Sequence, residues 1–243
     1  DYYLMPAGGY FGTKKACEPV HVQYSYDDKS VVVVNTTSQP RRNLKLTARV
    51  YDLNLVEKFS RTTDVDISAD SNVKAFSIPP VKDLSTTYFL KLTLDSAGEN
   101  LSSNFYWLST TDDVLDARGS KWYYTPVSSY ADMTGLGKLP AVNLKVSGSS
   151  VRRGAEEITH VSLVNSSRSL AFFVRLRITR GEKGGDVLPV FWEDNYVSLL
   201  PGERRQISAT YPVKSLGNAS ALLVAEAWNS PPVRISLATK HRQ

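Results

Sequence analysis

Apolar and polar residues alternate along most of this chain after position 20. In residues 44–50 and 90–95 every second side chain is Leu, Ala or Val, and Lys, Thr, Arg or Asp stand between them. A period of two places one face of a strand on a core and the other in water. Further strands are expected at residues 21–26, 31–35, 58–67, 74–78 and 105–109, a spacing typical of a β-sandwich.

The chain carries two copies of one strand pattern. Residues 31–37 read Val-Val-Val-Val-Asn-Thr-Thr, and 130 positions later residues 161–167 read Val-Ser-Leu-Val-Asn-Ser-Ser. The recurrence of this pattern at an offset of 130 positions indicates a duplicated domain. We therefore expect a mainly β fold with two tandem immunoglobulin-like sandwiches, at residues 20–110 and 141–243.

Residues 111–140 separate the two copies and are rich in Ser, Thr, Asp, Gly and Tyr. Their polar turns mark a domain boundary, but the segment also contains large aromatic side chains, namely Trp122, Tyr123, Tyr124 and Tyr130. Large aromatic residues usually pack on a neighbouring surface, because they bury much apolar area with few rotatable bonds. We expect this linker to lie against a surface.

Residues 1–19 have a different character from the strands that follow. An aromatic run and a Pro-Ala-Gly-Gly break precede a short helix-like segment that stops at Pro19. The segment has neither an initiator Met nor the composition of a signal peptide. We interpret it as the end of a different domain.

Three stretches have a distinctive sequence. The first is Gly-Tyr-Phe-Gly-Thr-Lys-Lys-Ala-Cys-Glu-Pro-Val-His-Val-Gln at residues 9–23. The second is Asn-Phe-Tyr-Trp-Leu-Ser at residues 104–109, followed by Lys-Trp-Tyr-Tyr-Thr-Pro-Val-Ser-Ser-Tyr-Ala-Asp-Met-Thr-Gly-Leu at residues 121–136, and the third is Asp-Asn-Tyr-Val-Ser-Leu-Leu-Pro-Gly-Glu at residues 194–203. These stretches resemble glycoside hydrolase family 2 enzymes of the β-mannosidase and exo-β-glucosaminidase type. The resemblance spans nearly the whole chain. Within the family, these segments are most similar to plant endo-β-mannosidases that act on the cores of N-glycans, and next to exo-β-glucosaminidases.

The resemblance implies that this chain is a non-catalytic C-terminal subunit or fragment of a retaining glycosidase. Residues 1–19 would then be the last helix of a (β/α)8 barrel carried by another chain, whose Glu pair performs the hydrolysis. The partners implied are this upstream catalytic chain and, through the assembly, an oligosaccharide with β-mannosidic linkages. Exo-β-D-glucosaminidase parentage is the alternative within the family.

The same resemblance places the opening residues near the sugar pocket of the barrel. Tyr2 and Tyr3 are then candidates for substrate binding, since phenol rings contact the C–H faces of sugars and their hydroxyls bond sugar hydroxyls. The alternative is that both only pack the barrel edge. Barrel completion also implies that the isolated chain exposes an apolar face made of Tyr10, Phe11 and Ala16.

No catalytic site is expected within this chain itself. A retaining glycosidase needs two carboxyl groups about 5 Å apart, and neighbours on an extended chain point to opposite faces. The adjacent pairs are all in predicted turns or at strand ends: Asp27-Asp28, Asp112-Asp113, Glu156-Glu157 and Glu193-Asp194. The three His residues lack partners at metal-ligand spacing, and no phosphate-binding glycine loop is present, so neither metal nor cofactor is expected.

Charge and hydropathy argue against nucleic-acid and membrane partners. The net charge is +5, but Lys and Arg are scattered, which argues against nucleic-acid binding. The apolar runs are strand-sized and far shorter than a membrane span, so no membrane partner is expected. The single Cys17 excludes an internal disulfide, and we expect it to be a small buried side chain.

Four Asn residues begin Asn-x-Ser/Thr triplets, namely Asn35, Asn100, Asn165 and Asn218. As glycosylation sites they indicate a secretory route, with a vacuolar or secreted location. The alternative is that Asn-Ser and Asn-Thr pairs only make turns.

A function of another class, a free-standing carbohydrate-binding or adhesion module, is the remaining alternative. Trp107 alternates with Phe105 and is expected in a core, whereas Trp192 stands at a turn and is the candidate for an exposed sugar-binding ring. Such a module explains the strands but gives the opening helix no role.

Overall fold

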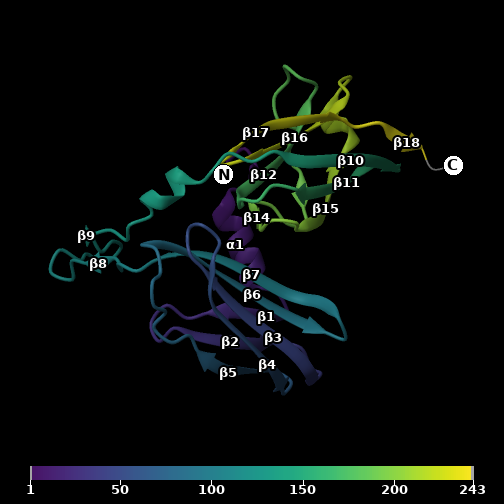
Figure 1. Cartoon of the computed structure of the whole chain (residues 1–243). Helices are drawn as coiled ribbons and strands as arrows, with labels where there is room; N and C mark the ends of the chain where they lie inside the picture. The colour runs from purple at the N-terminus through teal and green to yellow at the C-terminus, as the bar shows by residue number, and fades with distance from the viewer. Residues whose placement is uncertain (1, 242–243) are drawn as a thin grey trace. The chain divides into compact units, whose positions relative to one another are not determined.

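The computed structural model describes residues 2–241, which divide into two compact units (Figure 1). One unit comprises residues 14–139, and the other comprises residues 2–13 together with residues 140–241. Each unit contains one sandwich of two mainly antiparallel sheets and its own buried core. The mainly β, immunoglobulin-like fold expected from the sequence is therefore present. No helix among the described residues has the length and apolar character needed to cross a bilayer.

The first sandwich pairs a three-stranded sheet with a four-stranded sheet. In spatial order the smaller sheet contains β1 (Val20–Tyr24), β2 (Ser30–Asn35) and β5 (Ser71–Ser77). The larger contains β4 (Glu57–Ile67), β3 (Arg41–Tyr51), β6 (Thr87–Ser96) and β7 (Glu99–Ser109). Alternate residues of β3 and β6 face inward as predicted, with Leu46 and Leu92 fully buried.

The two-residue turn of the β6–β7 hairpin fixes the register of its two strands. Its two loop residues are Ala97 and Gly98, with φ of 50° and 86°. Positive φ at both positions matches the twist of a tight hairpin, and Gly98 adopts it without a side-chain clash.

The second sandwich has a five-stranded and a four-stranded sheet. The five-stranded sheet contains, in order, β13 (Phe191–Trp192), β15 (Arg204–Pro212), β11 (Glu156–Asn165), β10 (Leu144–Arg153) and β18 (Thr239–His241). The four-stranded sheet contains β14 (Val197–Leu199), β12 (Ala171–Arg180), β16 (Ala221–Ala227) and β17 (Ser230–Ser236), and a 3-10 turn, η2 (Val213–Leu216), follows β15.

The strand orders of the two units confirm the internal repeat. The run β1-β2-β5 of the first sandwich corresponds to β10-β11-β15 of the second, and β4-β3-β6-β7 corresponds to β14-β12-β16-β17. The conserved plan places the two Asn-Ser/Thr turns at the ends of equivalent strands, β2 and β11.

Helix α1 (Gly8–Ala16) is the only α-helix among the described residues. Phe11 is 4% exposed and belongs to the core of the second sandwich, with its ring 5.9 Å from that of Tyr196. Gly8 permits the start of the helix to lie close to Phe173, because a Cβ there would lie 2.8 Å from the Phe173 ring. The expectation that Phe11 is exposed on an apolar face is therefore wrong, whereas Tyr10 is exposed as expected.

Two further expectations about this region have clear outcomes. Ala16 is exposed, in agreement with the expectation. Cys17 follows the end of the helix and is exposed, so the expectation of a buried thiol is wrong.

The aromatic linker, expected at residues 111–140, belongs to the first unit as far as Leu139. It contains a small two-stranded sheet of β8 (Val114–Leu115) and β9 (Val127–Ser129), followed by the 3-10 helix η1 (Thr134–Lys138). Figure 1 shows it leaving the end of β7 as a projecting hairpin.

Candidate functional site

The two sugar-binding candidates lie next to each other at the start of the described chain. Tyr2 is 92% exposed and Tyr3 is 70% exposed, and their rings meet edge to face with centroids 5.3 Å apart. A small hollow in the second unit is lined by Met5 and Pro6 with Trp192, and neither tyrosine lines it. The two rings thus present an open aromatic surface.

The predicted carboxylate pairs serve structural contacts. Asp28 accepts a 2.7 Å hydrogen bond from Lys74 Nζ, and Asp194 accepts one of 2.8 Å from Arg205. Glu157, the second residue of β11, is only 2% exposed. These side chains stabilise turns and strand edges.

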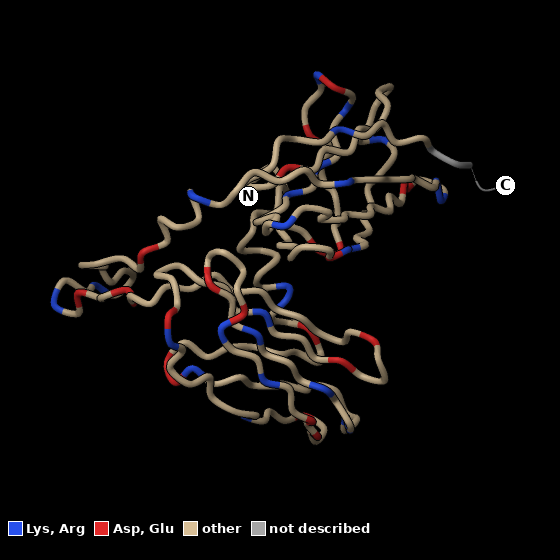
Figure 2. The backbone as a smooth tube through the Cα atoms, in the orientation of Figure 1, with Lys and Arg blue, Asp and Glu red and all other residues tan. Residues whose placement is uncertain are grey.

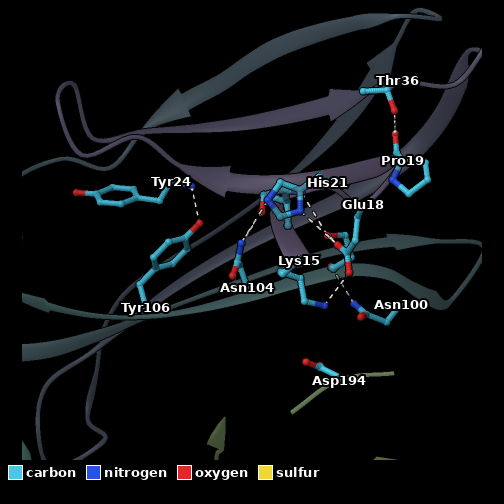
Figure 3. Close-up of polar contacts among 12 residues, drawn as sticks. Lys15, Glu18, Pro19, His21, Tyr24, Thr36, Asn100, Asn104, Tyr106 and Asp194 are labelled. Carbon is cyan, nitrogen blue, oxygen red and sulfur yellow. Dashed lines mark hydrogen bonds and ion pairs between the residues drawn. The ribbon is translucent and has the colours of Figure 1, made fainter. Parts of the chain in front are cut away.

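A polar cluster that the sequence did not reveal joins the end of α1 to the first sandwich (Figure 3). Glu18 lies at its centre and accepts hydrogen bonds from Lys15 Nζ at 2.7 Å and Ser102 Oγ at 2.7 Å. His21 Nδ1 lies 3.3 Å from the same carboxylate, and Asn104 Nδ2 lies 3.5 Å from His21 Nε2. His21 is 2% exposed, so the cluster is largely closed to solvent.

The electrostatics of this cluster favour a charged Glu18. Burial raises the pKa of the carboxyl, but the hydrogen bonds from His21, Lys15 and Ser102 outweigh burial and lower the pKa to about 2. The arrangement contains Ser, His and Glu but not the order of a catalytic triad, because Ser102 donates to Glu18 and not to His21. Its chemistry is that of a partly buried ionic clamp.

The sequence contained one signal for this clamp. Glu18 stands three positions before His21, and the two side chains meet across the Pro19 turn. Ser102 comes from β7, more than eighty positions away, so the third contact depended on the strand order.

A second Ser, His and Glu grouping lies on the outer face of the five-stranded sheet. His160 Nδ1 is 3.1 Å from Ser208 Oγ, and the Glu193 carboxylate accepts the backbone N–H of Ser208 at 3.2 Å. These residues line an open polar hollow over β10, β11 and β15. Because Glu193 contacts the backbone and not the imidazole, nothing orients His160 as a general base.

Two of the predicted glycosylation sites are buried corners of the fold. Asn35 and Asn165 are 0% exposed. Asn35 Nδ2 donates to the carbonyls of Gln39 and Ser68, both at 2.9 Å, and Asn165 Nδ2 donates to those of Ser169 and Leu199, both at 2.8 Å. Both amide hydrogens are used, so neither amide has a free position for a glycan in this fold.

The Ser/Thr of each triplet completes the same corner. Thr37 Oγ1 donates to Asn35 Oδ1, and Ser167 Oγ donates to Asn165 Oδ1, each at 2.7 Å. These corners support the turn interpretation of the two triplets.

The other two triplets lie at the surface. Asn100 is exposed beside the β6–β7 hairpin, and its Nδ2 lies 2.9 Å from Asp95 Oδ1. Asn218 is exposed in the turn after η2. Both remain candidates for modification.

Tryptophan exposure differs from the expectation. Trp192 is 6% exposed and belongs to the core of the second sandwich, so its predicted role as an exposed ring is wrong. Trp107, expected in a core, is 36% exposed. Because β13 continues the sheet beyond the turn, its inward face takes Trp192 and its outward face takes Phe191. Trp228 and Trp122 are exposed by 65% and 95%.

Charged residues of both signs are scattered over both units (Figure 2). Within residues 2–241 no three His, Cys, Asp or Glu side chains gather as ligands for a metal ion.

Comparison with known domain families covers both sandwiches. Residues 27–111 match the mannosidase Ig/CBM-like domain, and residues 122–230 match the exo-β-D-glucosaminidase Ig-fold domain. The second match includes the tip of the aromatic linker as well as the second sandwich.

Relatives of the two enzyme types differ in their identity to this chain. An exo-β-D-glucosaminidase of Amycolatopsis orientalis is 42% identical over 237 residues, which is 95% of this chain and 23% of the relative. A mannosylglycoprotein endo-β-mannosidase of Lilium longiflorum is 24% identical over 261 residues, covering 88% of this chain and 27% of the relative. The chain therefore spans about a quarter of the length of these relatives.

The crystal structure of the Amycolatopsis orientalis exo-chitosanase superposes with a TM-score of 0.91 and 40% identity, over 97% of this chain and 28% of that chain. The mannosidic relationship is the more distant, and the exo-β-D-glucosaminidase alternative fits better. The two sandwiches are thus immunoglobulin-fold domains of glycoside hydrolase family 2, of the exo-β-D-glucosaminidase type.

Proposed function

We propose that this chain is the non-catalytic immunoglobulin-fold portion of a retaining exo-β-D-glucosaminidase and that it supports the catalytic portion of that enzyme. The observation that carries the proposal is the 42% identity to an exo-β-D-glucosaminidase across 95% of the chain. The substrate class would be β-linked glucosamine oligosaccharides. A β-mannosidic substrate is the less favoured form of the same proposal, since the endo-β-mannosidase is only 24% identical.

The N-terminal segment is the proposed contact with the catalytic portion. Phe11 anchors α1 in the second sandwich, while the preceding residues Tyr2, Tyr3 and Leu4 are 92%, 70% and 62% exposed. Tyr10, on the helix itself, is 57% exposed. Exposed apolar side chains before and on an anchored helix are typical of an interaction surface. We propose that it completes a barrel supplied by the catalytic portion, with Tyr2 and Tyr3 at the rim of the sugar pocket.

The reactive carboxyl groups would come from that catalytic portion. Retaining hydrolysis requires two carboxyl groups facing each other across the scissile bond. The acidic residues in the adjacent pairs of this chain bind lysine, arginine and backbone N–H groups.

The test compares this 243-residue chain with the complete enzyme of which it is a portion. We expect the complete enzyme to release glucosamine from p-nitrophenyl β-D-glucosaminide much faster than mannose from the corresponding mannoside, and this chain alone to release neither. Faster hydrolysis of the mannoside would overturn the substrate class. Hydrolysis by this chain alone would overturn the non-catalytic role.

Two tyrosine variants test the pocket role in the complete enzyme. Tyr2→Ala together with Tyr3→Ala is expected to raise KM for the glucosaminide, because aromatic contact with the sugar is lost. Tyr26→Ala is the matched control, since Tyr26 is 68% exposed but lies in the first sandwich. Equal KM values for the two variants would remove Tyr2 and Tyr3 from the pocket.

A further inference from the structure

The aromatic linker exposes apolar side chains that its small two-stranded sheet does not bury. Trp122 is 95% exposed, Tyr123 68%, Tyr124 55% and Tyr130 72%. Val114 and Leu115, the two residues of β8, are also exposed, at 54% and 61%. An isolated two-stranded hairpin gains little stability from its own contacts in water. Exposed apolar side chains gathered on such a hairpin mark an interaction site.

The linker is held rigid at its tip. Lys121 N donates to Tyr124 O at 2.7 Å and Tyr124 N donates to Lys121 O at 3.2 Å, which closes a tight turn with Trp122 and Tyr123 at its apex. The rings of these two residues meet edge to face at 5.1 Å.

The base of the tip is capped by one carboxylate. Asp116 Oδ1 accepts the N–H groups of Arg118 and Gly119, both at 3.1 Å, and Asp116 N donates to Pro126 O at 2.8 Å. A Cβ on Gly119 would lie 2.5 Å from Asp116 Oδ2, so this position requires glycine for the cap to close.

Both ends of the linker are fixed to the first sandwich. Thr110 N donates to Thr86 O at 2.8 Å where the linker begins. Near its end, Thr87 Oγ1 donates to the carbonyl of Asp132 at 3.1 Å. The exposed rings are thus presented in one conformation, which lowers the entropy lost when a partner binds them.

The size of the surface favours a protein partner over a sugar. At 150–250 Å² for each aromatic side chain, the exposed parts of the four rings amount to roughly 400–700 Å². One side of a standard protein interface buries about 800 Å², whereas stacking of one sugar uses only one or two of these rings. Arg118 and Lys121 flank the tip, so a complementary surface carries carboxylates around an apolar recess.

We propose that the aromatic linker docks on the catalytic portion of the same enzyme, with Trp122 and Tyr123 inserted into an apolar recess rimmed by acidic residues. The relatives supply the source of this partner, since 72% of the exo-chitosanase chain lies outside the part matched by this protein, the match covering 28%. The inference rests on the proposed function for the identity of the partner. It adds a second contact, separate from the N-terminal segment.

Hydroxyl-radical footprinting tests the docking directly. Oxidation of Trp122 and Tyr123 is measured in this 243-residue chain, in the complete enzyme, and in each after addition of glucosamine hexasaccharide. The buried Trp192 provides the reference for a protected ring in every sample. We expect fast oxidation of Trp122 in this chain, and at least tenfold slower oxidation in the complete enzyme without sugar.

Three results would overturn the docking proposal. Fast oxidation in the complete enzyme would show that the linker is free, and slow oxidation in this chain alone would show that it packs on the chain itself. Protection that appears only with the hexasaccharide would make the linker a sugar site. Hydrolysis of the glucosaminide, measured on the same preparation, reports the proposed function separately.

A variant adds an energetic test. Trp122→Ala with Tyr123→Ala is expected to lower the Tm of the complete enzyme by about 3 °C or more, since buried aromatic anchors dominate interfaces. The same variant is expected to leave the Tm of this chain unchanged, because both rings are exposed there. Tyr26→Ala, at the same 68% exposure as Tyr123, is the control. Equal effects of the two variants on the complete enzyme would contradict docking.

Discussion

Replacing Glu18 by Gln removes the charge at the centre of the ionic clamp and keeps its shape. The carboxylate accepts hydrogen bonds from Lys15 and Ser102, both at 2.7 Å, and lies 3.3 Å from His21. The Gln carbonyl accepts one of these bonds, but its NH₂ group faces donors on the other side. We expect Glu18→Gln to destabilise the first sandwich.

The pKa of Glu18 provides the size of the effect. It lies at about 2 against an ordinary value of 4.5. This difference corresponds to at most about 3.4 kcal/mol of preference for the charged form in the folded state. The side chain is 27% exposed, so solvent screens part of this interaction. We expect a loss of about 1–2 kcal/mol in the free energy of unfolding at pH 7.

Urea unfolding at two pH values is the assay. A folded-state pKa below the unfolded-state value stabilises fully above about pH 4.5 and loses its effect as the pH falls through about 2. The difference between wild type and Glu18→Gln is therefore expected to shrink at pH 3 to roughly two fifths of its value at pH 7. Hydrogen exchange of β1 and β7 at pH 7 assigns the transition to the first sandwich.

Asp28→Asn is the matched control for this experiment. The hydrogen bond from Lys74, together with those from Ser30, holds the pKa of Asp28 at about 2 as well, but this ion pair is at the surface. We expect no measurable change for Asp28→Asn, because exposed ion pairs contribute little. A Glu18→Gln loss that is the same at pH 3 and pH 7, or no larger than that of Asp28→Asn, would refute the clamp.

Three further predictions concern the corners and the helix. Asn165→Ala is expected to lower the free energy of unfolding in urea by about 2–4 kcal/mol, because it leaves buried carbonyls without donors. The control Asn218→Ala, at an exposed position, is expected to change it by less than about 0.5 kcal/mol. Similar losses for the two variants would contradict the buried corner. Phe11→Ala is expected to cost about 3–5 kcal/mol and the exposed Tyr10→Ala almost nothing, and equal costs would show that Phe11 is not a core residue. Glycopeptide mass spectrometry after secretion from a eukaryotic host is expected to find glycans at Asn100 and Asn218 but none at Asn165, and a glycan at Asn165 would contradict this fold.

The strand pattern could be predicted because its signal is local. Residues 44–50 and 90–95 alternate strictly, and in the structure they lie in β3 and β6 with one face in the core. The repeat of the Val-Asn-Ser/Thr ending likewise indicated a second sandwich, and the shared strand order confirms it.

The predictions that failed concern residues whose contacts come from positions far away in the sequence. Phe11 is buried by Tyr196, far along the chain, and Trp192 is buried because the short β13 joins the edge of a sheet. The Glu18 clamp depends on Ser102 from β7. Nothing in the local sequence of these residues reveals which strand will lie beside them, so periodicity alone assigned them wrongly or missed them.

The two buried corners have a consequence for how such domains change over evolutionary time. A triplet normally disappears easily when a sugar attachment becomes unwelcome, because one substitution of its first or third residue abolishes recognition by the transferase. At Asn35 and Asn165 that same substitution also removes the amide or hydroxyl that holds a strand end in place. Lineages of this domain are therefore expected to retain both triplets whatever compartment they occupy, and counting them gives no indication of export.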